Sequence, residues 1–150
     1  MRIYRALPND AATLTHLAFR SKSHWGYSMQ FMEQCSEALT ITPEVIRDHI
    51  IYLGVTSDEQ FIGFYGLDNN PTRALLTDLF VDPTYIGKGY GKQLWDHMTK
   101  MAQDLGILEI EIESDPFAKS FYLRMGAKYK EEVPSQSIMG RTLPLLSYSL

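Results

Sequence analysis

Three glycines at alternate positions, Gly87, Gly89 and Gly91, separate a run of β-branched and aromatic residues from a long amphipathic stretch. The run from Ala74 to Val81 predicts a strand. The stretch after the glycines repeats apolar residues at helical spacing and is closed by a further glycine, which favours a helix ending near 105. The segment therefore predicts a strand, a glycine-rich loop and a helix in that order.

Such a loop is typical of anion binding. Glycines let the main chain approach a ligand closely, and the free N–H groups at a helix N-terminus favour a phosphate or pyrophosphate. Lys88 and Lys92 add positive charge. An isolated pattern of this kind is explained equally well by a turn that needs glycine for steric reasons. The spacing excludes GxGxxG, and Gln93 stands where a P-loop needs Ser or Thr.

Composition restricts the class of protein further. The chain of 150 residues is 45% hydrophobic and 21% charged, which predicts one domain over residues 1–150. A net charge of -4, without any basic run, argues against a nucleic-acid partner. The single cysteine, Cys35, excludes an internal disulfide and a multi-cysteine metal site, so no metal is expected. The first ten residues lack the apolar core of a signal peptide, so we expect a cytoplasmic location. No apolar run reaches the roughly 18 residues of a membrane span, so we expect no membrane partner.

The remaining pattern predicts alternating strands and helices. Helices are expected from a cap at Asn9 or Asp10 to about Lys22, within 23–39 after a loop, from Thr42 to about His49, and from Asp115 to a stop at Gly126. Strands are expected at 2–5, 51–56, 60–67, 107–113, 127–133 and 143–150. A helix joins 74–81 to 107–113, so these two strands should be parallel. The order predicts an α/β (α+β) fold with a mixed, mostly antiparallel sheet and helices on both faces.

Two segments carry a resemblance to a known family. The stretch Leu79 to Leu94 resembles motif A of the GCN5-related N-acetyltransferases (GNAT), a Q/R-x-x-G-x-G/A loop after a strand, with Gly89 and Gly91 at the motif glycines and Ile86 at the Gln or Arg position. The stretch from Asp115 to Ala127 is similar to the family segment N-P-x-A-x-x-F-Y-x-x-x-G-F, with Asp115 in place of Asn and Ala127 in place of Phe.

The resemblance implies a splayed parallel pair of strands, with acetyl-coenzyme A in the gap and its diphosphate on the loop amides. Tyr122 matches the family tyrosine that protonates the leaving thiolate, although its ring also suits simple packing on the helix's apolar face. The residues implied to bind the cofactor are Leu79, Phe80, Val81, Ile86, Gly87, Lys88, Gly89, Tyr90, Gly91, Lys92, Asp115, Ala118 and Phe121.

The acceptor site is less well defined by the sequence. An amine must lose a proton before it attacks, and Asp78, Glu113 and His24 are the candidate bases, although both carboxylates also suit solvated strand positions. His24, Trp25 and Tyr27 fall where the family builds its acceptor pocket, and Glu113 is placed there too. Trp25 suits a core anchor equally well. Arg141 is able to reach a carboxylate or to lie in a surface turn.

The resulting hypothesis is an N-acetyltransferase. It would move the acetyl group from acetyl-coenzyme A to a primary amine of a small molecule, peptide or protein. Cys35 is far in sequence from both motifs, which favours direct transfer in a ternary complex. The alternative is a catalytically inactive module that senses acyl-coenzyme A. A homodimer is possible in this family.

Overall fold

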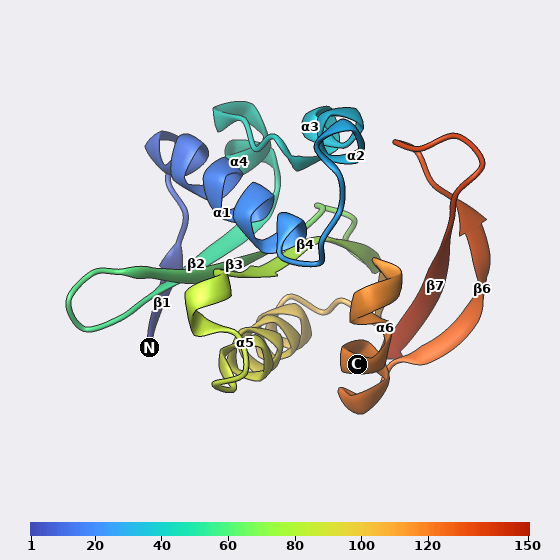
Figure 1. Cartoon of the computed structure of the whole chain (residues 1–150). Helices are drawn as coiled ribbons and strands as arrows, with labels where there is room; N and C mark the ends of the chain where they lie inside the picture. Colours follow the sequence, from blue (N-terminus) through green and yellow to red (C-terminus); the bar gives the residue numbers. More distant parts are fainter.

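The computed structural model describes all residues from Met1 to Leu150, and seven strands form one sheet in the order β1-β2-β3-β4-β5-β7-β6 (Figure 1). The strands are β1 Arg2–Arg5, β2 Ile50–Val55, β3 Phe61–Leu67, β4 Arg73–Val81, β5 Glu109–Glu113, β6 Lys128–Pro134 and β7 Thr142–Ser149. Every neighbouring pair is antiparallel except β4 and β5, which are parallel. The expected mixed sheet is confirmed.

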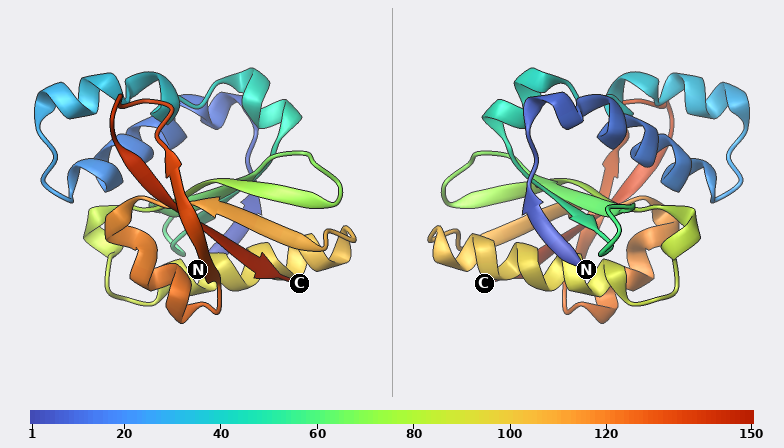
Figure 2. Two further views of the ribbon diagram at one scale, coloured as in Figure 1. Left: turned by 90° about the vertical axis from the view of Figure 1, so that its right-hand side faces the viewer. Right: turned by 90° about the vertical axis from the view of Figure 1, so that its left-hand side faces the viewer.

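Helices cover both faces of the sheet, as the views from the two sides show (Figure 2). One face carries α1 Ala11–Ser23, α2 Met29–Gln34, α3 Ser36–Leu39 and α4 Pro43–Asp48; the other carries α5 Tyr90–Asp104 and α6 Lys119–Arg124. Short 3-10 turns occupy Pro8–Asp10, Pro83–Tyr85 and Pro116–Ala118. No helix is both long and apolar enough to cross a membrane.

Each face has its own apolar core. The first packs α1 and its neighbours on the sheet through residues such as Leu14, Leu17 and Ile51, all nearly inaccessible to solvent. The second packs α5 through Leu94 and Met98. Because burial of apolar surface supplies most of the driving force for folding, these two layers fix the sheet between the two groups of helices.

The parallel pair separates soon after it begins. Its ladder runs from Arg73 with Glu109 to Leu75 with Glu111, and no pairing follows although β4 continues to Val81. The second half of β4 therefore has a free main-chain edge facing the gap. This is the splay that the family resemblance implied.

A β-bulge at Thr77 accompanies the separation. Gly66 of β3 pairs with Asp78, whereas Leu67 pairs with Leu76, so Thr77 is the extra residue on β4. A bulge of one residue exchanges the two faces of a strand from that point on. Leu76 belongs to the core under α5, whereas Phe80 packs against the core under α1. Alternation along the strand therefore turns Asp78 toward the α1 side.

Two local expectations need correction. Neither Asn9 nor Asp10 caps α1 with its side chain: Pro8 starts a 3-10 turn, and the Asp10 carboxylate instead accepts the Leu7 N–H at 2.9 Å. Trp25 is not a core anchor, because it is 41% exposed in the loop after α1.

Candidate active site

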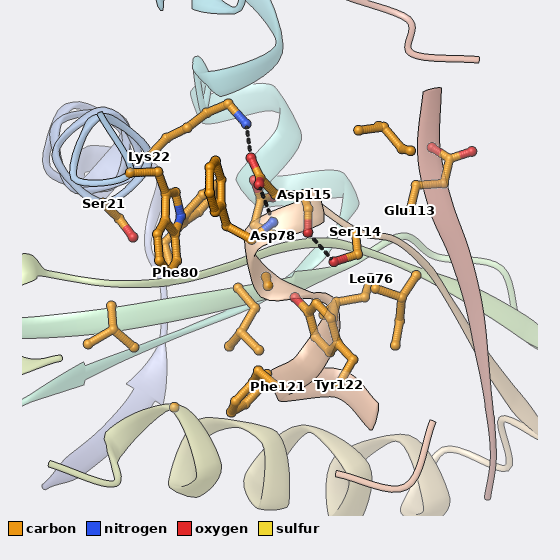
Figure 3. Close-up of a pocket in the computed structure, with 18 of the residues that line it drawn as sticks. Ser21, Lys22, Leu76, Asp78, Phe80, Glu113, Ser114, Asp115, Phe121 and Tyr122 are labelled. Carbon is orange, nitrogen blue, oxygen red and sulfur yellow. Dashed lines mark hydrogen bonds and ion pairs between the residues drawn. The ribbon is translucent and has the colours of Figure 1, made fainter. Parts of the chain in front are cut away.

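A cavity of about 890 Å³ opens where β4 and β5 separate (Figure 3). Its wall combines the second half of β4, the glycine loop, the end of β5, α6, the end of α1 and the chain before β7. The splay exposes main-chain groups of β4 to this space, so the cavity has polar main-chain atoms as well as apolar side chains along its length.

The glycine loop adopts the geometry that an anion site needs. Gly87 and Gly89 have φ of 80° and 84°, a left-handed conformation that costs a residue with a Cβ atom energy, and Gly89 is the N-cap of α5. The Ile86 N–H is the last main-chain donor before the loop that has an acceptor within the chain. The next is the Gln93 N–H, which donates to the Gly89 oxygen. The amides from Gly87 to Lys92 have no acceptor within the chain.

Gly91 has a different reason to be glycine. A Cβ atom there would lie 3.3 Å from Cε2 of Phe121, closer than ordinary van der Waals contact. The missing side chain lets α5 and α6 approach at the mouth of the loop. The loop is thus held against α6, next to the gap between the strands.

Most of the residues implied to bind the cofactor surround this cavity. Lys88 and Tyr90 are the exceptions, because their side chains do not line the cavity. Their main-chain amides still belong to the loop. The Lys92 ammonium is also engaged, since it pairs with Asp96 at 2.6 Å. The predicted residues that line the cavity are Leu79, Phe80, Val81, Ile86, Gly87, Gly89, Gly91, Lys92, Asp115, Ala118 and Phe121.

Asp78 and Tyr122 both line the cavity and are almost inaccessible to solvent, at 8% and 7% exposure (Figure 3). Burial raises the pKa of Asp78 to about 6, because the charged carboxylate loses solvation. Burial also raises the pKa of Tyr122 above its usual value, and the negative charges of Asp78 and Asp115 raise it further. The Tyr122 ring packs beside Trp95, with centroids 5.9 Å apart, so packing and access to the cavity coexist.

The Asp115 carboxylate is held by the chain's own groups. It accepts hydrogen bonds from Lys22 at 2.8 Å, from the Tyr27 hydroxyl at 2.8 and 3.0 Å, and from the Phe117 N–H at 2.9 Å. Burial alone would raise the pKa of Asp115, but the hydrogen bond and charge of Lys22 bring it below its usual value. Arg141 completes the cluster by donating to the Tyr27 oxygen at 2.7 Å. Asp115 thus lines the cavity while its carboxylate is held by an internal network, and its contact with the cofactor stays a prediction.

The predicted acceptor residues divide into two groups. Trp25 and Glu113 line the cavity, and the Trp25 ring stacks on Phe117 with centroids 5.3 Å apart and planes 8° from parallel. His24 and Tyr27 lie outside the lining. His24 ends α1, where it makes an edge contact with Trp25. Tyr27 supports the cavity wall through its hydrogen bonds to Asp115 and Arg141 and through an edge contact with the Phe117 ring.

An acyl carrier with a diphosphate and an extended arm fits this arrangement. The free loop amides suit the diphosphate, the open edge of β4 suits an amide-bearing arm, and a buried phenol faces the cavity. The fold and site together define a coenzyme A-dependent acyltransferase.

Comparison with known proteins agrees. The model of the acetyltransferase (GNAT) domain matches residues 19–138, and the chain belongs to this family, whose acyl donor is acetyl-coenzyme A. It is 28% identical to a spermidine N(1)-acetyltransferase of Thermoplasma acidophilum, over 87% of this chain and 89% of that protein.

Solved structures share the fold. A GCN5-related N-acetyltransferase from Rhodopseudomonas palustris has a TM-score of 0.82 at 22% identity, covering 99% of this chain and 95% of that one. The PaiA N-acetyltransferase of Thermoplasma acidophilum, solved with coenzyme A, has a TM-score of 0.80 at 23% identity, covering 99% and 98%. The expected fold, family and acyltransferase class are confirmed.

Proposed function

We propose that this protein transfers the acetyl group of acetyl-coenzyme A directly to a primary amine, with Asp78 as the proton acceptor and Tyr122 as the proton donor. The observation that carries this assignment is the convergence of a buried carboxylate and a buried phenol on one cavity beside the splayed strands. The thioester supplies the activated acetyl group. The main-chain edge of β4 orients it and offers N–H groups to the developing oxyanion.

The elevated pKa of Asp78 suits a base for amines. An alkylammonium group loses its proton near pH 10, so transfer to an ordinary carboxylate near 4 is unfavourable by about 6 pKa units. With the Asp78 pKa at about 6, the deficit falls to about 4 units, which lowers the cost of deprotonation by roughly 3 kcal/mol. Asp78 is still mostly ionised at pH 7 and therefore able to accept.

The two proton transfers are coupled through charge. Asp78 first passes the proton of the bound ammonium to solvent. As the neutral amine nitrogen then bonds to the acetyl carbon, its surplus proton passes to Asp78 and the carbon–sulfur bond breaks. Neutralising Asp78 removes one of the charges that raise the pKa of Tyr122, so the phenol becomes a better donor at the moment when the thiolate leaves. Solvent then takes the proton from Asp78 and restores the proton of Tyr122. The products are an amide and a free thiol.

The experiment is a free-thiol assay with acetyl-coenzyme A and a panel of amines, paired with calorimetry of coenzyme A binding. Spermidine is the first amine to assay because of the relative's name; amino acids, aminoglycosides and peptides complete the panel. Thiol release that depends on an amine, and on both Asp78 and Tyr122, supports the proposal. Binding of coenzyme A without thiol release from any amine would instead support the sensor module.

A further inference from the structure

Two partly buried cations on the cavity wall have no part in the chemistry described so far. Lys22, near the end of α1, and Arg141, just before β7, both line the cavity with side chains only 13% and 19% exposed. Transfer of a cation from water into such a position is costly unless it is paired. The hydrogen bonds and charge that Lys22 and Arg141 leave unpaired therefore indicate which ligand the site accommodates.

Most of their hydrogen-bonding capacity is unused. A guanidinium has five N–H donors, and Arg141 uses one of them in a hydrogen bond to the Tyr27 oxygen. An ammonium has three, and Lys22 uses one of them in a hydrogen bond to Asp115. The Arg141 guanidinium lies over the Phe31 ring, with Cζ 4.8 Å from the centroid, which fixes its orientation. The remaining donors have no acceptor in the chain.

The local charge does not balance either. Asp115 is the only carboxylate within ion-pair distance of Lys22, at 2.8 Å, and the nearest to Arg141, at 3.7 Å. Two cations against one carboxylate leave one positive charge in excess. Asp78 and Glu113 pair with neither cation. The cavity thus has a cationic part at Lys22 and Arg141 and anionic groups at Asp78 and Glu113.

We propose that the acceptor is an aminocarboxylate, whose carboxylate binds Arg141 and Lys22 while its amine faces Asp78. A carboxylate accepts two parallel hydrogen bonds from a guanidinium and would neutralise the excess charge. A polyamine would instead bring a second ammonium toward Lys22 and Arg141, and like charges at such a partly buried position repel. This inference rests on the proposed N-acetyltransferase function and specifies its acceptor.

The test compares each aminocarboxylate with matched acceptors that lack the negative charge. Ornithine and lysine are compared with their carboxamides and with putrescine and cadaverine, and spermidine is included. The enzymes are wild type, Arg141→Gln, Arg141→Lys and, as a control for loss of a distant positive charge, Arg47→Gln, which removes an exposed partner of Glu44. Coenzyme A affinity by calorimetry confirms that each variant is folded.

The expected result is a preference for the free carboxylates, with kcat/KM for these acceptors falling about 10- to 100-fold in Arg141→Gln, mainly through KM, because a charge-assisted hydrogen bond is lost. Activity with the carboxamides should fall far less in Arg141→Gln than activity with the free carboxylates, because the carboxamides have no negative charge for Arg141 to bind. Equal or better use of carboxamides or diamines, or activity confined to acceptors without a carboxylate, overturns the inference and leaves the proposed function intact. No thiol release with any acceptor contradicts the proposed function itself.

Discussion

Replacing Asp78 with Asn should make the protein more stable and much less active at neutral pH. Burial raises the pKa of the carboxyl from 3.8 to about 6, so the folded state holds this proton more tightly than the unfolded state does. At 1.36 kcal/mol per pKa unit, keeping the group ionised in the fold costs about 3 kcal/mol above pH 6.

The sign of the stability difference follows from how the free energy of unfolding depends on pH. Between pH 3.8 and about 6 the folded protein binds more protons than the unfolded chain, so the free energy of unfolding falls as pH rises and then levels off. Asparagine has no charge to bury. We therefore expect Asp78→Asn to exceed wild type by about 3 kcal/mol at pH 8, or roughly 6 to 12 °C in Tm, and to match it near pH 3.5.

The assay is urea unfolding of both proteins from pH 3.5 to 8, combined with kcat over the pH range where both are folded. Urea is preferred because it adds no ionic screening. Wild-type kcat should rise through about pH 6, whereas Asp78→Asn should lose that inflection and about 100- to 10,000-fold in rate. A stability difference that does not change with pH, or an Asn variant that is less stable at pH 8, would refute the reasoning.

Three further substitutions address other parts of the site. Tyr122→Phe should lower kcat about 100-fold or more, with coenzyme A affinity by calorimetry unchanged, since only the hydroxyl is removed; equal kcat would remove Tyr122 from the mechanism. Gly89→Ala places a Cβ at a φ of 84° and should cost roughly 1–2 kcal/mol of stability by urea unfolding, with weaker coenzyme A binding; an unchanged affinity would contradict a role for the loop amides. Ile86 is 40% exposed, so Ile86→Arg should fold normally and tighten coenzyme A binding several-fold through a charged contact with the diphosphate, an effect that salt weakens; a gain that persists in high salt would argue against such a contact.

The sequence predicted those parts of the fold that depend on local pattern. The strand, glycine loop and helix from Ala74 to Leu105 were expected and are present, because glycine spacing and apolar periodicity act over a few residues. The parallel pairing of β4 with β5 followed from the helix between them. Boundaries shifted by one or two residues, as with β5, which begins at Glu109 and not at Ile107.

The network around Asp115 could not be predicted in the same way. Lys22 and Asp115 are 93 residues apart, and Arg141 and Tyr27 are 114 apart, so no spacing rule connects them. Two partial signals were available. Arg141 was expected either to reach a carboxylate or to lie in a surface turn, and it lies 3.7 Å from Asp115. The departure from the family's Asn at Asp115 was the other, since a carboxylate beside a cavity requires a cation in the fold. Lys22 was missed because a lysine near the end of a helix ordinarily lies in solvent.

Asp78 shows how the fold and the chemistry depend on one irregularity in β4. Without the extra residue at Thr77, strict alternation would place Asp78 on the same face as Ala74 and Leu76, in the apolar core under α5, where a carboxylate has no partner. The bulge turns it to the α1 side, while Tyr122 remains with the α5 core. Base and acid therefore reach the gap from opposite faces of the sheet.

Gly66 makes room for the bulge at Thr77, because a Cβ atom there would lie 2.8 Å from Thr77 Oγ1 and 3.1 Å from Asp78 Oδ2. The same bulge lies where β4 loses its pairing with β5, so the opening for the acyl donor and the position of the proposed base arise together.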